Sequence, residues 1–235
     1  MPIIFVPQPS KKLWIPLLFL HIPKCGGSSV EQSFLKAGCR IKLHDRIDNL
    51  EYEFLENVLI YKCPSQHFHY EILDNIVDFN IFKDVFALVR NPYARLASEY
   101  RFLSGRIGSK PIKYPIDQWV DLVFKEYSKN PFILCNHIRP QVKFMVPGKT
   151  RIFKLENGME LMLRNLLRRL AVKEGLLRDD LPSNKMSIFH EKLTREEVGN
   201  GRTKEEVLLR NSDYLSRKIQ EFYLDDFKAF YPEDL

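Results

Sequence analysis

The sequence predicts an α/β fold in which a central parallel sheet is flanked by helices. Two apolar segments, Leu13–Leu20 and Asp84–Val89, are typical of buried strands, and a helical pattern follows each of them. A third strand is expected over residues 151–155, again before a helical segment. Because strands that alternate with helices form parallel sheets, this order favours the α/β class.

The first half of the chain follows this order. A glycine turn after the first strand leads into a helix that starts near Ser28 and stops at Gly38. The apolar face of this helix is expected to contain Val30, Phe34 and Leu35. A short strand is then expected over 58–62 and a helix over 71–79. The helix after the second strand should begin at Pro92, since proline suits the first turn.

The second half should be mainly helical. We expect a loop over 105–115, helices over 116–127 and 158–172, and a loop over most of 175–200. Residues 204–230 should be largely helical. Since no long polar linker interrupts the chain, residues 1–235 are expected to form a single domain.

Composition excludes a disordered or fibrous chain, because 45% of the residues are apolar and 28% are charged. The net charge of +6 favours anionic partners without choosing among them. Four cysteines without a CxxC pair predict free thiols in a reducing compartment. The longest apolar run, Leu13–Leu20, is too short for a membrane helix, and no signal peptide is recognised. We therefore expect a cytoplasmic protein, the alternative being the Golgi lumen if an anchor has been removed.

The loop between the first strand and its helix has the features of an anion-binding site. It reads His21-Ile-Pro-Lys24-Cys25-Gly26-Gly27-Ser28-Ser29. Glycines let a backbone approach a ligand closely, and the first amides of a helix are unpaired and partly positive. Lys24 adds a cation, and the serines add hydroxyl donors. The segment predicts a phosphate cradle, the alternative being a glycine turn with a serine helix cap and no ligand.

This loop differs from the standard P-loop, G-x-x-x-x-G-K-[ST], because Lys24 precedes the glycines. ATP hydrolysis is therefore less favoured than the use of another phosphorylated nucleotide. The strand, loop and helix still predict a P-loop-like three-layer sandwich.

A second junction of strand and helix carries Arg90. This arginine falls at the carboxyl end of its strand, where ligands bind in open α/β sheets, and a guanidinium can hold a phosphate with two hydrogen bonds. Ser98 lies two turns into the following helix and off its apolar stripe. The alternative for Arg90 is a structural ion pair.

Both junctions resemble the cofactor signatures of the membrane-type sulfotransferase family, which includes heparan sulfate and chondroitin sulfotransferases and their bacterial relatives. The family loop H-x-P-K-[TS]-[GA]-[GS]-[TS]-[TS] matches residues 21–29, and its R-[DN]-P-x-x-R-x-x-S segment matches residues 90–98. Weaker likenesses continue at 139–141, 152–156, 182–184 and 223–231. One departure is Cys25, where the family has threonine or serine, and a thiol is a weak donor.

The resemblance implies a sulfotransferase that uses 3'-phosphoadenosine-5'-phosphosulfate (PAPS), releases adenosine-3',5'-bisphosphate and needs no metal. It implies in-line transfer to an acceptor hydroxyl, with a glycan favoured as acceptor. The implied cofactor-binding residues are Lys24, Cys25, Gly26, Gly27, Ser28, Ser29, Arg90 and Ser98. Lys24 would also neutralise the leaving oxygen, and Lys185 is a candidate to close over the site.

A catalytic base is expected in the segment Ser65-Gln-His67-Phe-His69-Tyr70, because an acceptor hydroxyl must lose a proton. The family resemblance, with its H-x-x-Y-like loop, implies His67 as the base and His69 as second choice. Two alternatives stay open. The histidines could bind a metal with Cys63, or they could be surface residues. His21 is expected to be structural.

Two other functions compete with sulfuryl transfer. A nucleotide kinase of the P-loop class is disfavoured by the position of Lys24. A non-enzymatic nucleic-acid binder would be supported by a basic run that contains Arg164, Arg168, Arg169 and Lys173. That run lies opposite a leucine-rich face, which is typical of an ordinary solvated helix surface, and no nucleic-acid motif is present. We therefore expect no nucleic-acid partner.

Overall fold

The computed structural model describes residues 1–8, 11–43, 63–105, 114–174, 197–198 and 201–235. The chain divides into two compact units. The first contains residues 1–89 and 143–191, and the second contains residues 90–142 and 192–235. The strand expected over 58–62 lies outside the described residues, as does most of the loop expected over 175–200.

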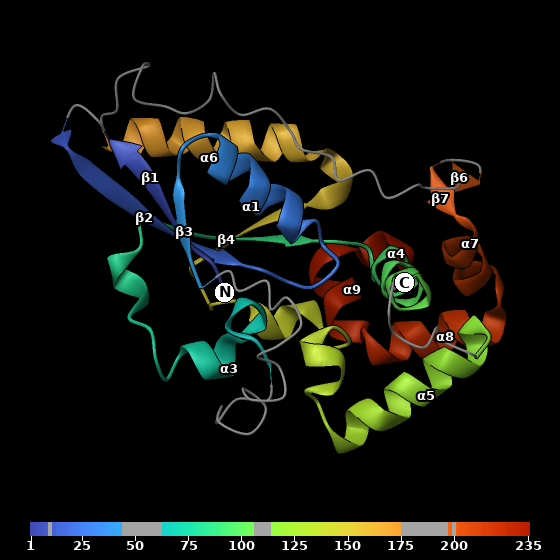
Figure 1. Cartoon of the computed structure of the whole chain (residues 1–235). Helices are drawn as coiled ribbons and strands as arrows, with labels where there is room; N and C mark the ends of the chain where they lie inside the picture. The colour runs from blue at the N-terminus through green and yellow to red at the C-terminus, as the bar shows by residue number, and fades with distance from the viewer. Residues whose placement is uncertain (9–10, 44–62, 106–113, 175–196, 199–200) are drawn as a thin grey trace. The chain divides into compact units, whose positions relative to one another are not determined.

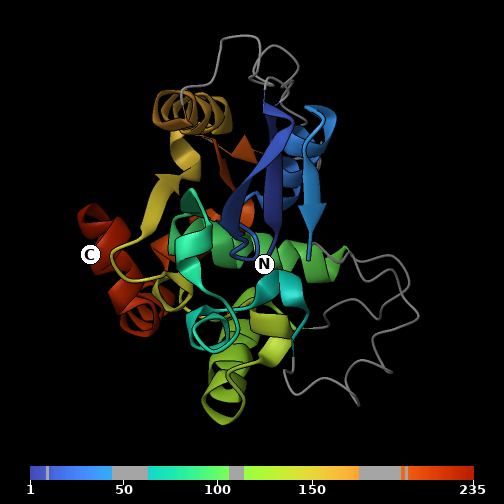
Figure 2. The same ribbon diagram turned by 90° about the vertical axis from the view of Figure 1, so that its left-hand side faces the viewer.

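A five-stranded mixed sheet forms the centre of the first unit (Figure 1). Its strands are β1 (Ile3–Gln8), β2 (Leu13–Leu20), β3 (Arg40–Lys42), β4 (Asp84–Val89) and β5 (Thr150–Lys154), in the order β3-β1-β2-β4-β5. Figure 2 shows β3 and β5 at its opposite edges. The expected parallel pairing holds between β2 and β4 and between β4 and β5.

The sheet is not parallel throughout, which corrects the prediction from the sequence. Strand β1 runs antiparallel to both of its neighbours, β2 and β3. Neither β1 nor β3 is expected from the sequence. In β1, Pro7 argues against a strand, yet the alternating burial of Ile4, Val6 and Gln8 shows that one face meets the core.

Helices α1 (Gly27–Lys36) and α6 (Met159–Glu174) lie on the same side of the sheet, and α3 (Tyr70–Leu73) lies on the other (Figure 1). The core includes Phe86 of β4, whose ring lies 5.0 Å from Phe19 and 6.3 Å from Phe34 between centroids. The predicted buried face of α1 is partly right, since Phe34 is fully buried while Leu35 is 36% exposed.

The helix expected over 71–79 is much shorter in the structure. Helix α3 ends at Leu73, and a 3-10 turn, Phe79–Ile81, follows after a break. The side chain of Asn75 donates to the carbonyl of Glu71, and the side chain of Asp78 accepts from the Asn80 amide. Such side chains compete with the backbone for hydrogen bonds, which explains why the helical pattern stops.

The second unit is mainly helical. Its helices are α4 (Pro92–Ser104), α5 (Ile116–Lys129), α7 (Lys204–Asn211), α8 (Asp213–Phe222) and α9 (Leu224–Phe230), with a short ladder of β6 (Glu197–Val198) and β7 (Arg202–Thr203). Phe124 of α5 stacks on Phe222 of α8 at 3.9 Å between centroids. No helix in the described ranges is both long and apolar enough to cross a bilayer.

Candidate functional site

The loop between β2 and α1 is wound tightly at the end of a buried strand. Lys24 and Gly26 both have left-handed backbones, with φ of +65° and +84°. Gly26 also forms the N-cap of α1 without any side-chain capping bond. Its carbonyl accepts from the amides of Ser29 and Val30 at 3.1 and 3.2 Å. The helix therefore begins within the predicted cradle, at Gly27.

Two amides at the start of α1 are available to a ligand. Within the described part of the chain, no acceptor is paired with the N–H groups of Gly27 and Ser28. These groups belong to the first turn, where the helix dipole adds partial positive charge. Ser28, Ser29 and Lys24 are half-buried beside them in the sequence. This end of α1 can hold an anion through its backbone.

Packing within the first unit disfavours a side chain at both glycines, most strongly at Gly27. A Cβ on Gly27 would lie 2.3–2.5 Å from atoms of the His21 ring, closer than real Cβ contacts allow. A Cβ on Gly26 would lie 3.1 Å from Leu155 and 3.2 Å from Met159. The space that a side chain would need at either glycine is therefore occupied by His21, Leu155 and Met159. The sequence suggested close approach to a ligand as the reason for the glycines, and the structure supplies this additional one.

His21 belongs to a buried polar cluster beneath the loop. Its Nδ1 lies 2.5 Å from Oε1 of Glu31 and 2.9 Å from Nε2 of Gln66. His21 is 5% exposed and Glu31 only 1%. Because Nδ1 carries at most one proton, we assign Nδ1–H as donor to the Glu31 carboxylate, which also accepts from Gln66 at 3.4 Å. His21 is thus fixed at the strand end by partners that the sequence did not reveal.

The structure brings the predicted base close to this cluster. His67 ends a 3-10 turn, Ser65–His67, and its ring lies 5.4 Å from that of His21 in an edge-to-face arrangement. His67 is half-buried. Since His21 also contacts Gly27, the glycine loop and His67 share one neighbourhood in the first unit.

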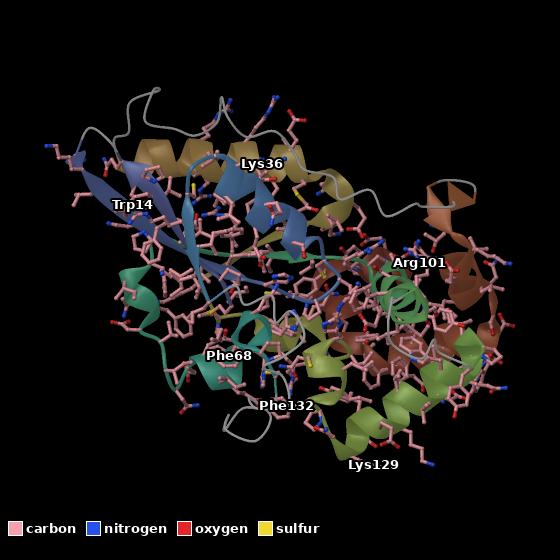
Figure 3. The ribbon with its side chains drawn as sticks, viewed as in Figure 1. Trp14, Lys36, Phe68, Arg101, Lys129 and Phe132 are labelled. Carbon is pink, nitrogen blue, oxygen red and sulfur yellow. The ribbon has the colours of Figure 1, made fainter. Side chains whose placement is uncertain are left out.

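His69 lies in a different environment. It is only 2% exposed, and its Nε2 lies 3.5 Å from a carboxylate oxygen of Glu71. Phe68, labelled in Figure 3, lies between the two histidines in the sequence and is also buried. A general base must reach its substrate, so accessibility favours His67 over His69 for that role.

Cys25 is directed into the loop itself. The residue is 1% exposed, its thiol donates to the Pro23 carbonyl at 3.6 Å, and its amide donates to the Ile22 carbonyl at 3.3 Å. Both donors of Cys25 are therefore engaged within the protein. Among the described residues, no three His, Cys, Asp or Glu side chains gather closely enough to hold a metal ion.

Arg90 directly follows β4 and is half-buried. Its amide donates to Oε1 of Gln141 at 2.9 Å, and its carbonyl accepts from Nε2 of the same side chain at 2.8 Å. Helix α4 then begins at Pro92, capped by the Asn91 side chain, which accepts from the Tyr93 amide at 3.1 Å. These bonds hold the backbone at the start of the predicted 3'-phosphate segment.

Two further residues of this segment differ in their surroundings: Arg95 is buried and Ser98 is half-buried. Arg95 is 2% exposed and donates to the carbonyls of Arg139 and His137 at 2.9 and 2.8 Å. It therefore ties α4 to the 137–139 segment. Ser98 is half-buried on the same helix. His137, to which the sequence assigned no role, pairs with Glu99 at 2.7 Å.

Sequence reasoning missed Glu31, Gln66, Gln141 and Asp226. Only Glu31 left a readable signal, because a glutamate four residues after Gly27 shares its helix face and therefore lies beneath the loop. The other three act through long-range contacts. Lys185 and the family-like segment 182–184 lie outside the described residues.

Comparison with known proteins gives one match. A sequence model described as the sulfotransferase family matches residues 15–232, which is most of the chain. A search of curated proteins and a search of solved structures each found no match.

Proposed function

The chain belongs to the sulfotransferase family, and from this we propose that it transfers a sulfuryl group from PAPS to an acceptor hydroxyl. We propose a carbohydrate as the acceptor class, following the sequence resemblance described above. The observation that carries the proposal is the loop of residues 21–29, whose first helix amides remain available beside Lys24.

The pairing of the two strands that lead into the motifs supports the use of one nucleotide. Strands β2 and β4 are parallel neighbours, with Leu20 paired to Ala87. Their carboxyl ends therefore meet at the same edge, and the chain leaves that edge into the glycine loop and into Arg90. Ligands of open α/β sheets bind outside such strand ends. We accordingly propose a P-loop-like sandwich in which both units act as one sulfotransferase domain, as the extent of the family match supports.

Each residue has a defined part in the proposed reaction. The amides of Gly26, Gly27 and Ser28 and the hydroxyls of Ser28 and Ser29 hold the 5'-phosphate and sulfuryl oxygens, with Cys25 shaping the loop through its bonds to Pro23 and Ile22. Arg90 and Ser98 bind the 3'-phosphate and so discriminate against ATP. PAPS, when bound, supplies a sulfuryl group joined to phosphate through a bridging oxygen.

Lys24 and His67 carry the chemical step. Lys24 neutralises the negative charge that grows on the bridging oxygen as the bond to sulfur breaks. His67 takes the proton from the acceptor hydroxyl as its oxygen bonds to sulfur. The products are a sulfate ester and adenosine-3',5'-bisphosphate, and no step requires a metal. The four free cysteines support a reducing compartment, and we propose the cytoplasm.

A thermal-shift comparison tests the proposed donor. Adenosine-3',5'-bisphosphate should raise the melting temperature through ligand linkage, and ADP, which lacks a 3'-phosphate, should raise it much less at equal concentration. Equal shifts with the two nucleotides would contradict the assignment of Arg90 and Ser98. Stabilisation by ATP with magnesium alone would favour a kinase instead.

A further inference from the structure

We propose that Gln141 and Asp226 are positioning residues that aim Arg90 and thereby set the preference for a 3'-phosphate. The inference rests on the proposed function, because it concerns the same nucleotide. It gives a role to Gln141, which ends the family-like segment 139–141 that the reaction itself leaves unused.

The side-chain amide of Gln141 makes the two backbone hydrogen bonds at Arg90 that a neighbouring strand would make in a sheet. The ladder between β4 and β5 ends with Val89 paired to Lys154. One residue further on, the Gln141 side chain accepts from the Arg90 amide and donates to the Arg90 carbonyl, at 2.9 and 2.8 Å. One side chain thus bonds both backbone groups of the residue that is proposed to bind phosphate.

Asp226 holds Gln141 in turn. Its Oδ2 accepts from the Gln141 backbone amide at 2.8 Å and from Nε2 at 3.3 Å, and its Oδ1 accepts from the Val142 amide at 2.9 Å. Gln141 and Asp226 are both fully buried. Because Nε2 faces two acceptors and Oε1 faces a donor, only one orientation of the Gln141 amide satisfies the network.

The result is an anchored backbone that carries an accessible side chain. Arg90 is half-buried, while the next residue, Asn91, is buried and precedes Pro92, which restricts its backbone. Bidentate binding of a phosphate depends on the direction of the guanidinium. A backbone fixed in advance lowers the entropy lost on binding, so loss of Gln141 should weaken recognition of the 3'-phosphate in particular.

The experiment compares the affinities of two nucleotides by calorimetry. Adenosine-3',5'-bisphosphate and AMP differ only in the 3'-phosphate, so their affinity ratio isolates its recognition. The variant Gln141→Met keeps the volume of the side chain and removes its hydrogen bonds. Arg90→Ala sets the scale of complete loss. Tyr223→Phe is the matched control, because it removes a buried bond of 2.9 Å to the Ile138 carbonyl in the same unit without touching Arg90.

We expect Gln141→Met to lower the affinity ratio at least about 10-fold, which corresponds to about 1.4 kcal/mol, and Arg90→Ala to lower it further. Tyr223→Phe should keep the wild-type ratio even where its melting temperature falls. Should Gln141→Met fail to fold, Gln141→Asn, which is one methylene shorter, should give the same loss.

The outcomes separate the inference from the function on which it rests. If Arg90→Ala lowers the ratio and both Gln141 variants keep it, the inference is wrong and the proposed role of Arg90 stands. A Tyr223→Phe protein with an equally reduced ratio would show a general effect of destabilisation and also overturn the inference. If Arg90→Ala leaves the ratio unchanged, the assignment of the 3'-phosphate to Arg90 fails, and the inference fails with it.

Discussion

Lys24 occupies a left-handed backbone position in the loop after β2, with φ of +65°. Few residues other than glycine adopt this conformation without strain. The fold keeps a long cationic side chain there, one position before a buried cysteine. Its place in the sequence shortly before the open amides of α1 fits the proposed role in charge neutralisation.

We therefore expect Lys24→Ala to slow the chemical step by about 100-fold or more, as loss of a charge-stabilising group does. Release of adenosine-3',5'-bisphosphate from PAPS measures the rate. Lys24→Gly relieves the backbone and also removes the charge, so it should be equally slow and no less stable. Near-normal turnover in both variants would show that the lysine has no part in catalysis.

His67 is the residue whose replacement tests the proposed base. His67→Ala should reduce turnover by about 10² to 10⁴-fold and leave nucleotide affinity nearly intact, because general-base catalysis affects only the proton transfer. His69→Ala should cost less activity, although removal of this buried side chain should lower the melting temperature. Turnover, nucleotide affinity and melting temperature are measured for each variant.

The same variants distinguish the alternatives for the 65–70 segment. An active His67→Ala and an inactive His69→Ala would move the base by two positions. If a chelator destabilises the wild type and mutation of Cys63 does damage similar to that of the histidine variants, the segment binds a metal and the base lies elsewhere.

Local residue types predict a candidate site, whereas the residues that hold it in place could not be predicted. Glycines, a lysine and serines between a strand and a helix indicate an anion site from a few adjacent positions. The His21 ring pairs with Glu31, 10 positions away, and Gln66, 45 positions from His21, donates to the same carboxylate. Contacts over such separations are set by the folded sheet, and apart from the helix spacing between Gly27 and Glu31 the sequence contains no pattern for them.

At the scale of elements, the junction of β2 and α1 depends on the absence of a side chain at Gly27. Helix α1 starts against the His21 ring, and that ring is held by Glu31 from the same helix. His21, at the end of the strand, therefore packs against the start of the helix at Gly27 and is held there by Glu31.

Gly27→Ala should destabilise the protein by about 1–3 kcal/mol, as overpacking in a filled core does, and should also weaken binding of adenosine-3',5'-bisphosphate. Thermal unfolding and calorimetry measure the two effects. Gly105→Ala is the control, because a Cβ there would lie 3.4 Å from its nearest neighbour, the Arg101 carbonyl, and the φ of Gly105 is negative. An equally stable Gly27→Ala protein would refute the packing explanation.

Elements were predicted best where apolar runs and capping residues agree. Strands β2 and β4 have the bounds expected from their apolar runs, and α4 begins at the predicted proline. Strand β1 was missed because its half-buried positions include Pro7, and β3 because three residues give too short a pattern. Pairing with neighbouring strands stabilises both, and that contribution is tertiary.

At the scale of the whole molecule, Asp226 links pH to stability. Burial raises the pKa of this carboxyl group above the ordinary value, although Arg95 and the bonds from Gln141 and Val142 act in the opposite direction. An acid with a raised pKa binds protons more tightly in the folded state than in the unfolded state. Its contribution to the free energy of unfolding is therefore largest below the unfolded pKa of about 3.9 and decreases as pH rises through the folded value.

Asp226→Asn should destabilise the fold at all pH values, since its NH₂ group would face a backbone donor. The loss in free energy of unfolding relative to wild type should be larger at about pH 4 than at about pH 7. Only the wild type has a buried carboxyl group whose ionisation destabilises the fold as pH rises. Chemical denaturation at the two pH values measures this difference. A loss that grows with pH would show that Arg95 and the hydrogen bonds outweigh burial.

The groups of residues 21–29 that we propose to bind an anion are mainly N–H groups of the main chain, which every amino acid except proline supplies. The proposed binding therefore depends more on the backbone conformation of this segment than on its side chains. A cysteine at position 25 is compatible with such a loop, since its thiol donates to the Pro23 carbonyl. Substitutions that leave the backbone path intact should be tolerated during evolution or design, whereas a side chain at position 27 would overlap the His21 ring and one at position 26 would strain a left-handed backbone. New acceptor specificities are accordingly best sought outside this loop.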